Sequence, residues 1–143
     1  MPSPTSVPEH SQLTVLYDED CRFCRWSVAK LISLDGAAHL RPEPIQSELG
    51  QQLLAAIPTA ERLASAHCVD AAGQVSSGGD AFSLVAAQIP GLGFASRVAS
   101  AVPIVPQVGY RLVAGNRGSF GRFMTTERVA AADLAIAARR KQP

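Results

Sequence analysis

The 143-residue sequence is poor in cysteine, in aromatic residues and in charge. It has three cysteines, 6% aromatic residues and 17% charged residues. A disulfide-stapled secreted fold normally carries four, six or eight cysteines, so that class does not fit. The formal net charge is +1 and the basic residues are spread along the chain. This is unlike the dense basic stripe of a nucleic-acid-binding protein, so no nucleic-acid partner is expected.

Long apolar runs are also missing. The most apolar segment, 81–115, is interrupted by prolines, glycines and Arg97, whereas a bilayer span needs about 20 predominantly apolar residues. We therefore expect core-facing helices there and no membrane span. Residues 1–12 lack the basic start and the apolar stretch of a secretory signal and are rich in proline and serine. They predict a mobile tail and a cytoplasmic location.

The first predicted elements of the chain are a buried strand and a helix. The segment 13–17 is short and apolar without strict alternation, which is typical of a strand buried on both faces. Over 21–34 the apolar residues recur mainly at helical spacing, with Asp20 as the expected N-cap and Asp35-Gly36 as the stop. Trp26 is expected to face the core.

The next segments alternate between strands and helices. We predict, in order, a strand at 39–45, a helix at 47–57, a hairpin of strands 65–69 and 74–77, and a helix that begins at 78–80 and ends at 90–91. Pro42 and Pro44 restrict the strand to a sheet edge, and Ser47 and Asp80 are the expected N-caps. The apolar residues expected to face inward from these two helices are Leu49, Leu53, Leu54, Ile57, Phe82, Leu84, Val85 and Ile89.

The element order β-α-β-α-β-β-α is that of a thioredoxin or glutaredoxin core. The predicted fold class is therefore α/β with a thioredoxin-like core, in one domain. Further helices are expected at 94–102, 106–114 and 126–140. The run Arg139-Arg140-Lys141 is expected to be a solvated helix end, where cations suit the helix dipole.

Cys21-Arg22-Phe23-Cys24 lies where the first strand turns into the first helix. Residues three apart at a helix start face the same side, so the two sulfurs can close a small ring. The free N–H groups and the dipole at the helix N-terminus favour a thiolate, which is the species that attacks disulfides. We expect Cys21 to be the nucleophile and Cys24 the resolving thiol.

Charged neighbours are candidates for tuning these thiols. Arg22 and Arg25 should favour the thiolate, whereas Asp18 and Asp20 should oppose it if they are ionised and close.

Three alternatives to a redox pair remain open: a metal site, an inert buried pair and a chance occurrence of the Cys-x-x-Cys pattern. The only other soft ligands considered are His67 and Cys68, which are adjacent on a predicted strand and so point to opposite faces. Only one could join Cys21 and Cys24, which leaves a zinc site one protein ligand short, so no metal is expected. Cys68 is expected in the core and His67 as a surface or hydrogen-bonded strand residue, although its loop could approach the dithiol.

Three blocks of the sequence resemble one family. Leu16-Tyr17-Asp18-Glu19-Asp20-Cys21-Arg22-Phe23-Cys24 resembles the opening motif of the DCC family of thioredoxin-like thiol-disulfide oxidoreductases, which is named for an Asp and two cysteines. The segment 67–73 followed by 79–81 resembles the family's hairpin and next helix start. The segment 110–117 resembles its late Tyr-x-x-x-Ala-x-Asn-Arg signature.

The resemblance implies protein-disulfide reductase activity or a related exchange, with Asp18, Cys21 and Cys24 as the named motif. Tyr110, Asn116 and Arg117 match family positions to which we assign no role; we expect Asn116 to cap a helix C-terminus and Arg117 to be packed. The resemblance covers about 13–120, so we expect a mobile tail over 1–12, a dithiol domain over 13–120 and a helical extension over 121–143.

The sequence departs from the family and from thioredoxins at three places. Glu19 stands where the family usually has Gly, which would be costly if that backbone needed a positive φ. Arg22 stands where Pro is frequent. The stretch 64–66 contains no proline in the place of the thioredoxin cis-proline, so substrate docking is expected to differ.

The leading functional hypothesis is an enzyme that exchanges thiols and disulfides without a cofactor, acting on a protein or small-molecule substrate. The alternative is a partner-binding module in which the helices after Leu92 dock a partner or a membrane surface and the dithiol senses redox state. The sequence predicts neither the substrate nor the oligomeric state.

Overall fold

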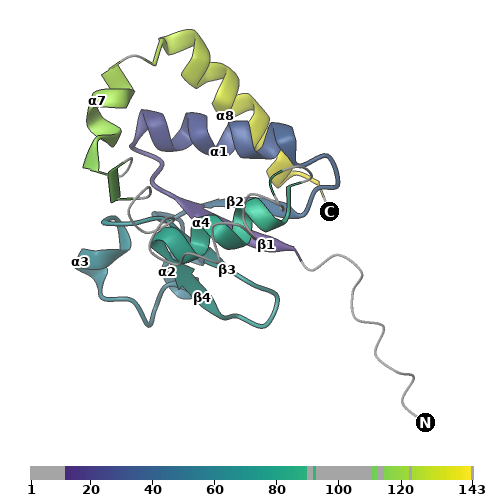
Figure 1. Cartoon of the computed structure of the whole chain (residues 1–143), viewed down its shortest axis with the longest axis vertical. Helices are drawn as coiled ribbons and strands as arrows, with labels where there is room; N and C mark the ends of the chain where they lie inside the picture. The colour runs from purple at the N-terminus through teal and green to yellow at the C-terminus, as the bar shows by residue number, and fades with distance from the viewer. Residues whose placement is uncertain (1–11, 90–91, 93–110, 113–114, 123, 143) are drawn as a thin grey trace.

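The protein is a mixed α/β structure built on one central sheet (Figure 1). The computed structural model describes residues 12–89, 92, 111–112, 115–122 and 124–142. In this part of the chain the sheet has four strands in the order β2-β1-β3-β4. Their bounds are β1 Leu13–Tyr17, β2 Leu40–Pro44, β3 His67–Val69 and β4 Val75–Ser77. β1 and β2 are parallel, whereas β3 is antiparallel to both β1 and β4.

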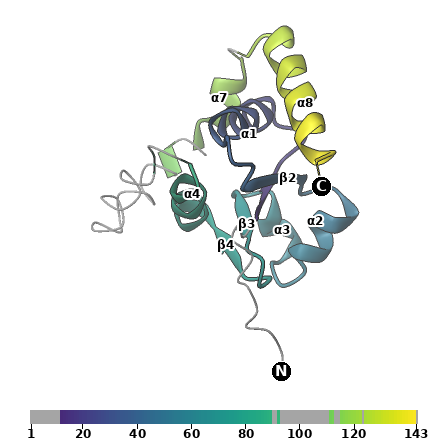
Figure 2. The ribbon, with the colours of Figure 1, turned by 90° about the vertical axis from the view of Figure 1, so that its right-hand side faces the viewer.

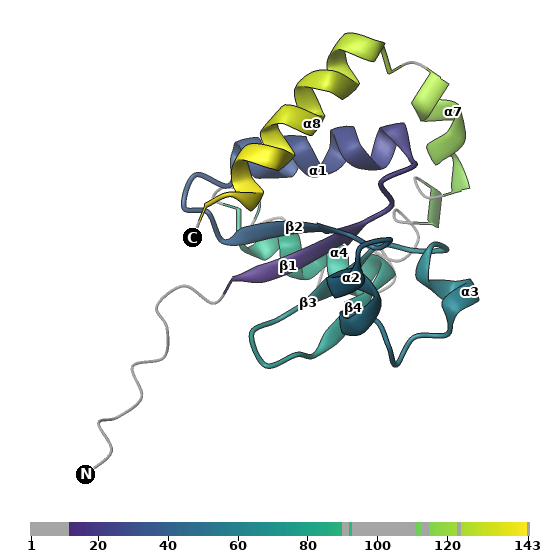
Figure 3. The same ribbon diagram turned by 180° about the vertical axis from the view of Figure 1, so that it is seen from behind.

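Helices cover both faces of this sheet. The described helices are α1 Arg22–Leu34, α2 Glu48–Leu53, α3 Thr59–Arg62, α4 Gly78–Ala87, α7 Arg117–Arg122 and α8 Thr126–Arg140. Figure 2 shows the sheet between α4 on one side and α2 on the other. In Figure 3, α8 slants across α1 and meets it near the C-terminal ends of both helices, and α7 lies next to the N-terminal end of α1. The predicted α/β fold class is confirmed, and the sheet is consistent with a thioredoxin-like fold.

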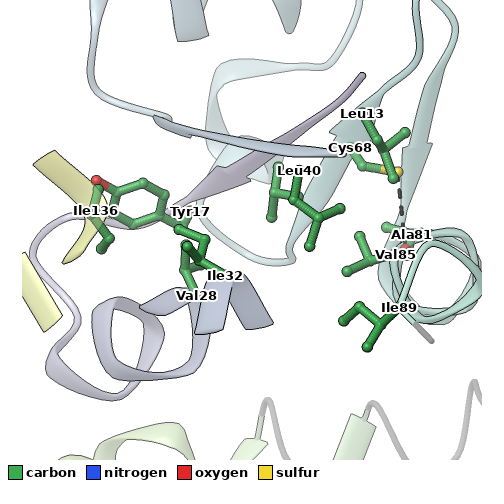
Figure 4. Close-up of a cluster of buried hydrophobic side chains, with 11 residues drawn as sticks. Leu13, Tyr17, Val28, Ile32, Leu40, Cys68, Ala81, Val85, Ile89 and Ile136 are labelled. Atoms are coloured by element: carbon green, nitrogen blue, oxygen red, sulfur yellow. Dashed lines mark hydrogen bonds between the residues drawn. The ribbon is translucent and has the colours of Figure 1, made fainter. Parts of the chain in front are cut away.

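β1 is buried on both faces, as predicted from its apolar residues without strict alternation. Leu13, Val15 and Tyr17 belong to the larger core cluster, which α1, α4 and α8 cover (Figure 4). Leu16 points to the other face and packs with Ile45, Leu54 and Val69. A strand buried in this way fixes the position of the chain that leaves it, which is the loop that leads to Cys21.

β2 is an edge strand, which confirms the prediction from its two prolines. Pro42 pairs with Val15 and Pro44 with Tyr17 on the inner side. Proline has no N–H to offer to a further strand, so it is tolerated at this edge. The backbone continues in register one residue further, because Ile45 N–H donates to Tyr17 O at 2.8 Å.

Two predicted N-caps are wrong, each because a neighbouring residue ends the preceding segment. Cys21, not Asp20, caps α1, since Asp20 lies inside a turn in which Cys21 N–H donates to Asp18 O. Ser77, not Asp80, occupies the cap position of α4, because β4 runs directly into that helix. Asp80 lies in the first turn, where its carboxylate suits the helix dipole.

The helix predicted over 47–57 is shorter than expected. Ser47 is the N-cap, with its Oγ accepting from Gly50 N–H at 2.9 Å, but α2 ends at Leu53. Leu54 is the fully buried C-cap, and the next backbone N–H, that of Ala55, donates three residues back to Gln52 O instead of continuing the helix. Gly50 and Leu54 form the buried face, so the inward position predicted for Leu49 is wrong and its side chain is exposed.

The inward face of α4 is also narrower than predicted. Ala81 and Val85, with Ala86 beside them, form the buried stripe of α4, and Ile89 continues it two residues past the end of the helix. Phe82 and Leu84 lie off that stripe and are 54% and 43% exposed. On α1, Val28 and Ile32 are buried, whereas Trp26, which was expected in the core, is only half-buried. Its ring stacks on Phe23 with centroids 6.1 Å apart.

α8 has the predicted bounds, and Ile136 joins the larger core cluster. The prediction of a solvated basic end is wrong for Arg139. Its guanidinium donates to the buried carboxylate of Asp35 at 2.8 Å and to three backbone carbonyl oxygens, those of Ile32, Asp35 and Leu40. Arg140 is exposed and pairs with Glu43 at 3.3 Å.

Some predicted elements lie outside the described residues. These are the tail up to residue 11, the helix at 94–102 and most of the helix at 106–114, of which residues 111 and 112 are described and helical. In the described part of the chain, no helix combines the length and apolar character needed to cross a membrane.

Candidate active site

Cys21 and Cys24 lie together at the N-terminal end of α1. Cys21 occupies the N-cap position with an extended backbone, φ −94° and ψ 112°. Its Sγ accepts a hydrogen bond from Cys24 N–H at 3.2 Å, so sulfur takes the place that a serine or aspartate oxygen usually fills. Both side chains are half-buried, and all three cysteines of the chain are thiols in this structure. An N–H donor and a helix N-terminus both stabilise negative charge on the accepting atom.

The loop 18–20 is held by its own hydrogen bonds and by Gln46. Asp18 Oδ1 accepts from Asp20 N–H at 3.0 Å and from Gln46 Nε2 at 2.6 Å. Gln46 Oε1 in turn accepts from Glu19 N–H at 3.1 Å. The side-chain amide therefore spans the loop and orients the residue before Cys21.

Gln46 was missed in the sequence, although a signal for it exists. It follows β2 by two residues, and β2 is the parallel neighbour of β1. The carboxyl ends of neighbouring parallel strands meet at one edge of a sheet, where sites are commonly built. A polar residue just after the second strand was thus a candidate partner for the loop after the first.

Glu19 is accommodated without backbone strain. Among the described residues, Ala38 is the only non-glycine with a positive φ, at 57°. The position that is usually Gly in the family therefore does not require a left-handed backbone here. Glu19 contributes its backbone groups to the loop, and its side chain is exposed.

The two arginines near the dithiol have different surroundings. Arg22 is exposed. Arg25 makes a two-pronged ion pair with Asp133 of α8, through Nε to Oδ1 at 2.9 Å and Nη2 to Oδ2 at 2.7 Å. The hydrogen bonds that Arg25 donates to Asp133 raise the pKa of Arg25, so the guanidinium stays charged. Asp133 was missed because it lies 108 residues away in sequence.

α7 lies beside the first turn of α1. A Cβ added to Gly121 would lie 4.0 Å from the Arg22 Cβ, which is ordinary contact. Just before α7, Asn116 Nδ2 donates to Leu112 O at 2.7 Å, the kind of bond made by a residue that ends a helical turn. Tyr110 and the side chain of Arg117 lie outside the described part of the chain.

His67 uses both of its ring nitrogens inside the fold. Nε2 lies 2.9 Å from Arg62 O and Nδ1 lies 2.6 Å from Ser77 Oγ. A carbonyl only accepts, so Nε2 carries the proton and Nδ1 accepts from the Ser77 hydroxyl. Burial lowers the pKa of His67, although the bond to Arg62 opposes this. The hydrogen-bonded strand histidine is confirmed, and neither nitrogen is directed at the dithiol.

Cys68 is a core residue, as predicted. It is 1% exposed and lies in the cluster that α1 and α4 cover. Burial raises its pKa to about 11, and its Sγ–H donates to Ala81 O at 3.9 Å. Among the residues that the structure describes, no three His, Cys, Asp or Glu side chains gather in a group suited to a metal ion.

Comparison with known protein families identifies the family of the chain. The family model of the DCC1-like thiol-disulfide oxidoreductases matches residues 15–123. The chain belongs to this family. No curated protein and no solved structure matches it. The name of the DCC1-like family indicates a redox role. The matched residues include Cys21, Cys24 and the loop before them. α8, which carries Asp133, begins after the matched residues.

Proposed function

We propose that this chain exchanges thiols and disulfides, with Cys21 as the nucleophile and Cys24 as the resolving thiol. The observation that carries the proposal is the hydrogen bond from Cys24 N–H to Cys21 Sγ at the start of α1. This donor is part of the backbone and stays in place when Cys24 is replaced. It stabilises charge on Cys21 both before attack and when Cys21 is the leaving group.

The proposed reaction has two steps. The Cys21 thiolate attacks one sulfur of a substrate disulfide, forms a mixed disulfide and expels the other substrate sulfur, which takes up a proton as a thiol. Cys24 then loses its proton and attacks Cys21 Sγ, which forms the Cys21–Cys24 disulfide and releases the second substrate thiolate. The substrate gains two electrons and the protein dithiol loses two. Two equivalents of an external thiol return the protein to the dithiol form.

The surroundings support different roles for the neighbouring residues. Gln46 and Asp18 fix the loop, and exposed Arg22 and Asp20 are positioned to contact substrate or to tune the thiols. The sulfur pair itself stores the two electrons, so the reaction needs no cofactor. The substrate is a protein or small-molecule disulfide, and the cytoplasm is our predicted compartment.

The experiment is insulin reduction with dithiothreitol as the electron donor. Cys21→Ser is expected to abolish turnover above the rate of dithiothreitol alone, because it removes the thiol at the N-cap of α1 that accepts the backbone hydrogen bond. Cys24→Ser, mixed with insulin in the absence of dithiothreitol, is expected to stall as a mixed disulfide between Cys21 and a substrate chain, which mass spectrometry detects. Cys68→Ala is the matched control and should keep its activity.

Two results would overturn the proposal. One is turnover by Cys21→Ser at the rate of the unmodified protein. The other is a native protein without turnover whose affinity for a partner changes on oxidation, which would favour the redox-sensing binding module.

A further inference from the structure

We propose that Asp133 is a positioning residue for the dithiol, which acts by neutralising Arg25 and by holding that guanidinium against the loop before Cys21. The inference rests on the proposed function, because it concerns the reactivity of the same thiols. It assigns to α8, which lies beyond the residues of the family match, a part in the chemistry of the site.

The geometry ties three segments together. Arg25 directly follows Cys24, and its backbone N–H donates to Cys21 O at 3.1 Å. The Arg25 Nε and Nη2 atoms donate to the two carboxylate oxygens of Asp133, and the remaining Nη1 donates to Glu19 O at 3.4 Å. A guanidinium held at both ends in this way has a fixed orientation, which a lysine could not reproduce.

The Arg25–Asp133 ion pair affects the thiols through the charges that surround them. The charged or titratable groups on the elements around the pair include Asp18, Glu19 and Asp20 of the loop, Arg22 of α1, Arg122 of α7 and Tyr17 of β1, which interacts with both Arg25 and Asp133. Arg25 would add a positive charge one residue after Cys24 and one turn after Cys21, and so would favour the thiolate. With Asp133 in contact, that charge is compensated, so the thiols experience less of it.

The pair is suited to tuning rather than to stabilising the fold. The side chains of Arg25 and Asp133 are 24% and 49% exposed, and ion pairs of this exposure contribute little to folding. Removing the Asp133 charge should therefore leave the protein folded while the reactivity of Cys21 changes.

The test is the rate of Cys21 alkylation by iodoacetamide across pH, measured in a Cys24→Ser background so that one half-buried thiol is followed. Asp133→Asn is expected to raise the rate on the acid side of the profile roughly two- to fivefold, because Arg25 is then uncompensated. Arg25→Gln is expected to lower it by a similar factor. Asp133→Glu keeps the charge and should restore the original profile.

The double variant tests whether the two charges offset each other at the thiols. In the Arg25→Gln background, Asp133→Asn is expected to bring the alkylation profile back towards that of the unmodified protein, because neither charge is then left uncompensated. Glu127→Gln removes a charge from the exposed first turn of the same helix and is the matched control, with no change expected.

Two outcomes would overturn the inference. One is an unchanged profile for Asp133→Asn. The other is a double variant that keeps the altered profile of either single variant, which would mean that the two charges do not offset each other at the thiols. Insulin turnover is measured in parallel with Cys24 restored. If Asp133→Asn has normal insulin turnover and an unchanged alkylation profile, only the inference about Asp133 is wrong. If insulin turnover does not depend on Cys21, the proposed function is wrong.

Discussion

Asp35 and Arg139, 104 residues apart, form an ion pair of 2.8 Å in which the carboxylate is fully buried. Asp35 also accepts from the backbone N–H groups of His39 and Leu40 at 3.1 and 2.7 Å. The pair therefore joins the C-terminal ends of α1 and α8 to the start of β2. A buried charge is tolerated only when it is paired and hydrogen-bonded in this way.

Arg139→Ala is expected to destabilise the protein by about 3–5 kcal/mol, because it leaves a buried carboxylate without its counter-charge. The same change removes donors from three backbone carbonyl groups. Lys141→Ala is the control directly after the same helix end and should cost less than about 1 kcal/mol, since Lys141 is exposed. Urea unfolding measures both. Equal losses in the free energy of unfolding for the two variants would show that the buried Asp35–Arg139 pair does not stabilise the fold more than an exposed charge does.

Cys68 is expected to stay unreactive in the folded protein. It is 1% exposed and burial raises its pKa to about 11, so few thiolates form and reagent has no access. Iodoacetamide at about pH 8 should label Cys21 first and Cys68 only after denaturant is added. Peptide mapping by mass spectrometry gives the order. Rapid labelling of Cys68 without denaturant would place it at an open surface, against the structure.

The strands could be predicted from the sequence because each carries its own signal. β1 is an apolar run, the prolines of β2 mark an edge, and the hairpin of β3 and β4 follows from the turn chemistry of Asp70 to Gly73. In the structure Asp70 Oδ1 accepts from Ala72 and Gln74 N–H, and Gly73 has a φ of 84°. Such signals are local and need no knowledge of the rest of the fold.

The partners around the dithiol could not be predicted in the same way. The spacing of Cys21 and Cys24 was enough to locate the site. The ion pairs Arg25–Asp133 and Asp35–Arg139, however, link positions more than 100 residues apart. A periodic pattern in the sequence does not predict such distant pairs. The N-cap predictions were wrong for a different reason. Whether Asp20 or Cys21 begins α1 depends on the hydrogen bonds of the loop, which only the folded chain determines.

His67 should make stability depend on pH. Burial lowers its pKa in the folded protein, so between the folded and unfolded pKa values the unfolded chain binds more protons. Its contribution is fully present above about pH 6.5 and is lost as the pH falls through the lowered value, with a slope of at most about 1.4 kcal/mol per pH unit.

The measurement compares urea unfolding of the unmodified protein and His67→Gln between about pH 8 and about pH 5. The unmodified protein should lose more stability on acidification than the variant, which has no group to titrate at this position. His39 is present in both proteins, so the difference isolates His67. Parallel pH curves for the two proteins would mean that His67 has the same proton affinity folded and unfolded.

Gly50→Ala is expected to destabilise the protein even though it improves helix propensity. Alanine in place of glycine favours a helix by about 1 kcal/mol. Here, however, the added Cβ would overlap Pro44 O and lie 2.8 Å from Ile45 O. Both are backbone atoms that cannot rotate away, so we expect a net loss of about 1–3 kcal/mol.

Gly36→Ala is the control, because a Cβ there has nothing within 4 Å, and its effect should stay within about 1 kcal/mol. Urea unfolding of both variants decides the sign, and a stabilised Gly50→Ala would show that α2 can move away from the end of β2. Since Ile45 directly precedes Gln46, a shift of this backbone would also displace the amide that holds Asp18. Gly50→Ala should therefore slow Cys21 alkylation as well, whereas Gly36→Ala should not.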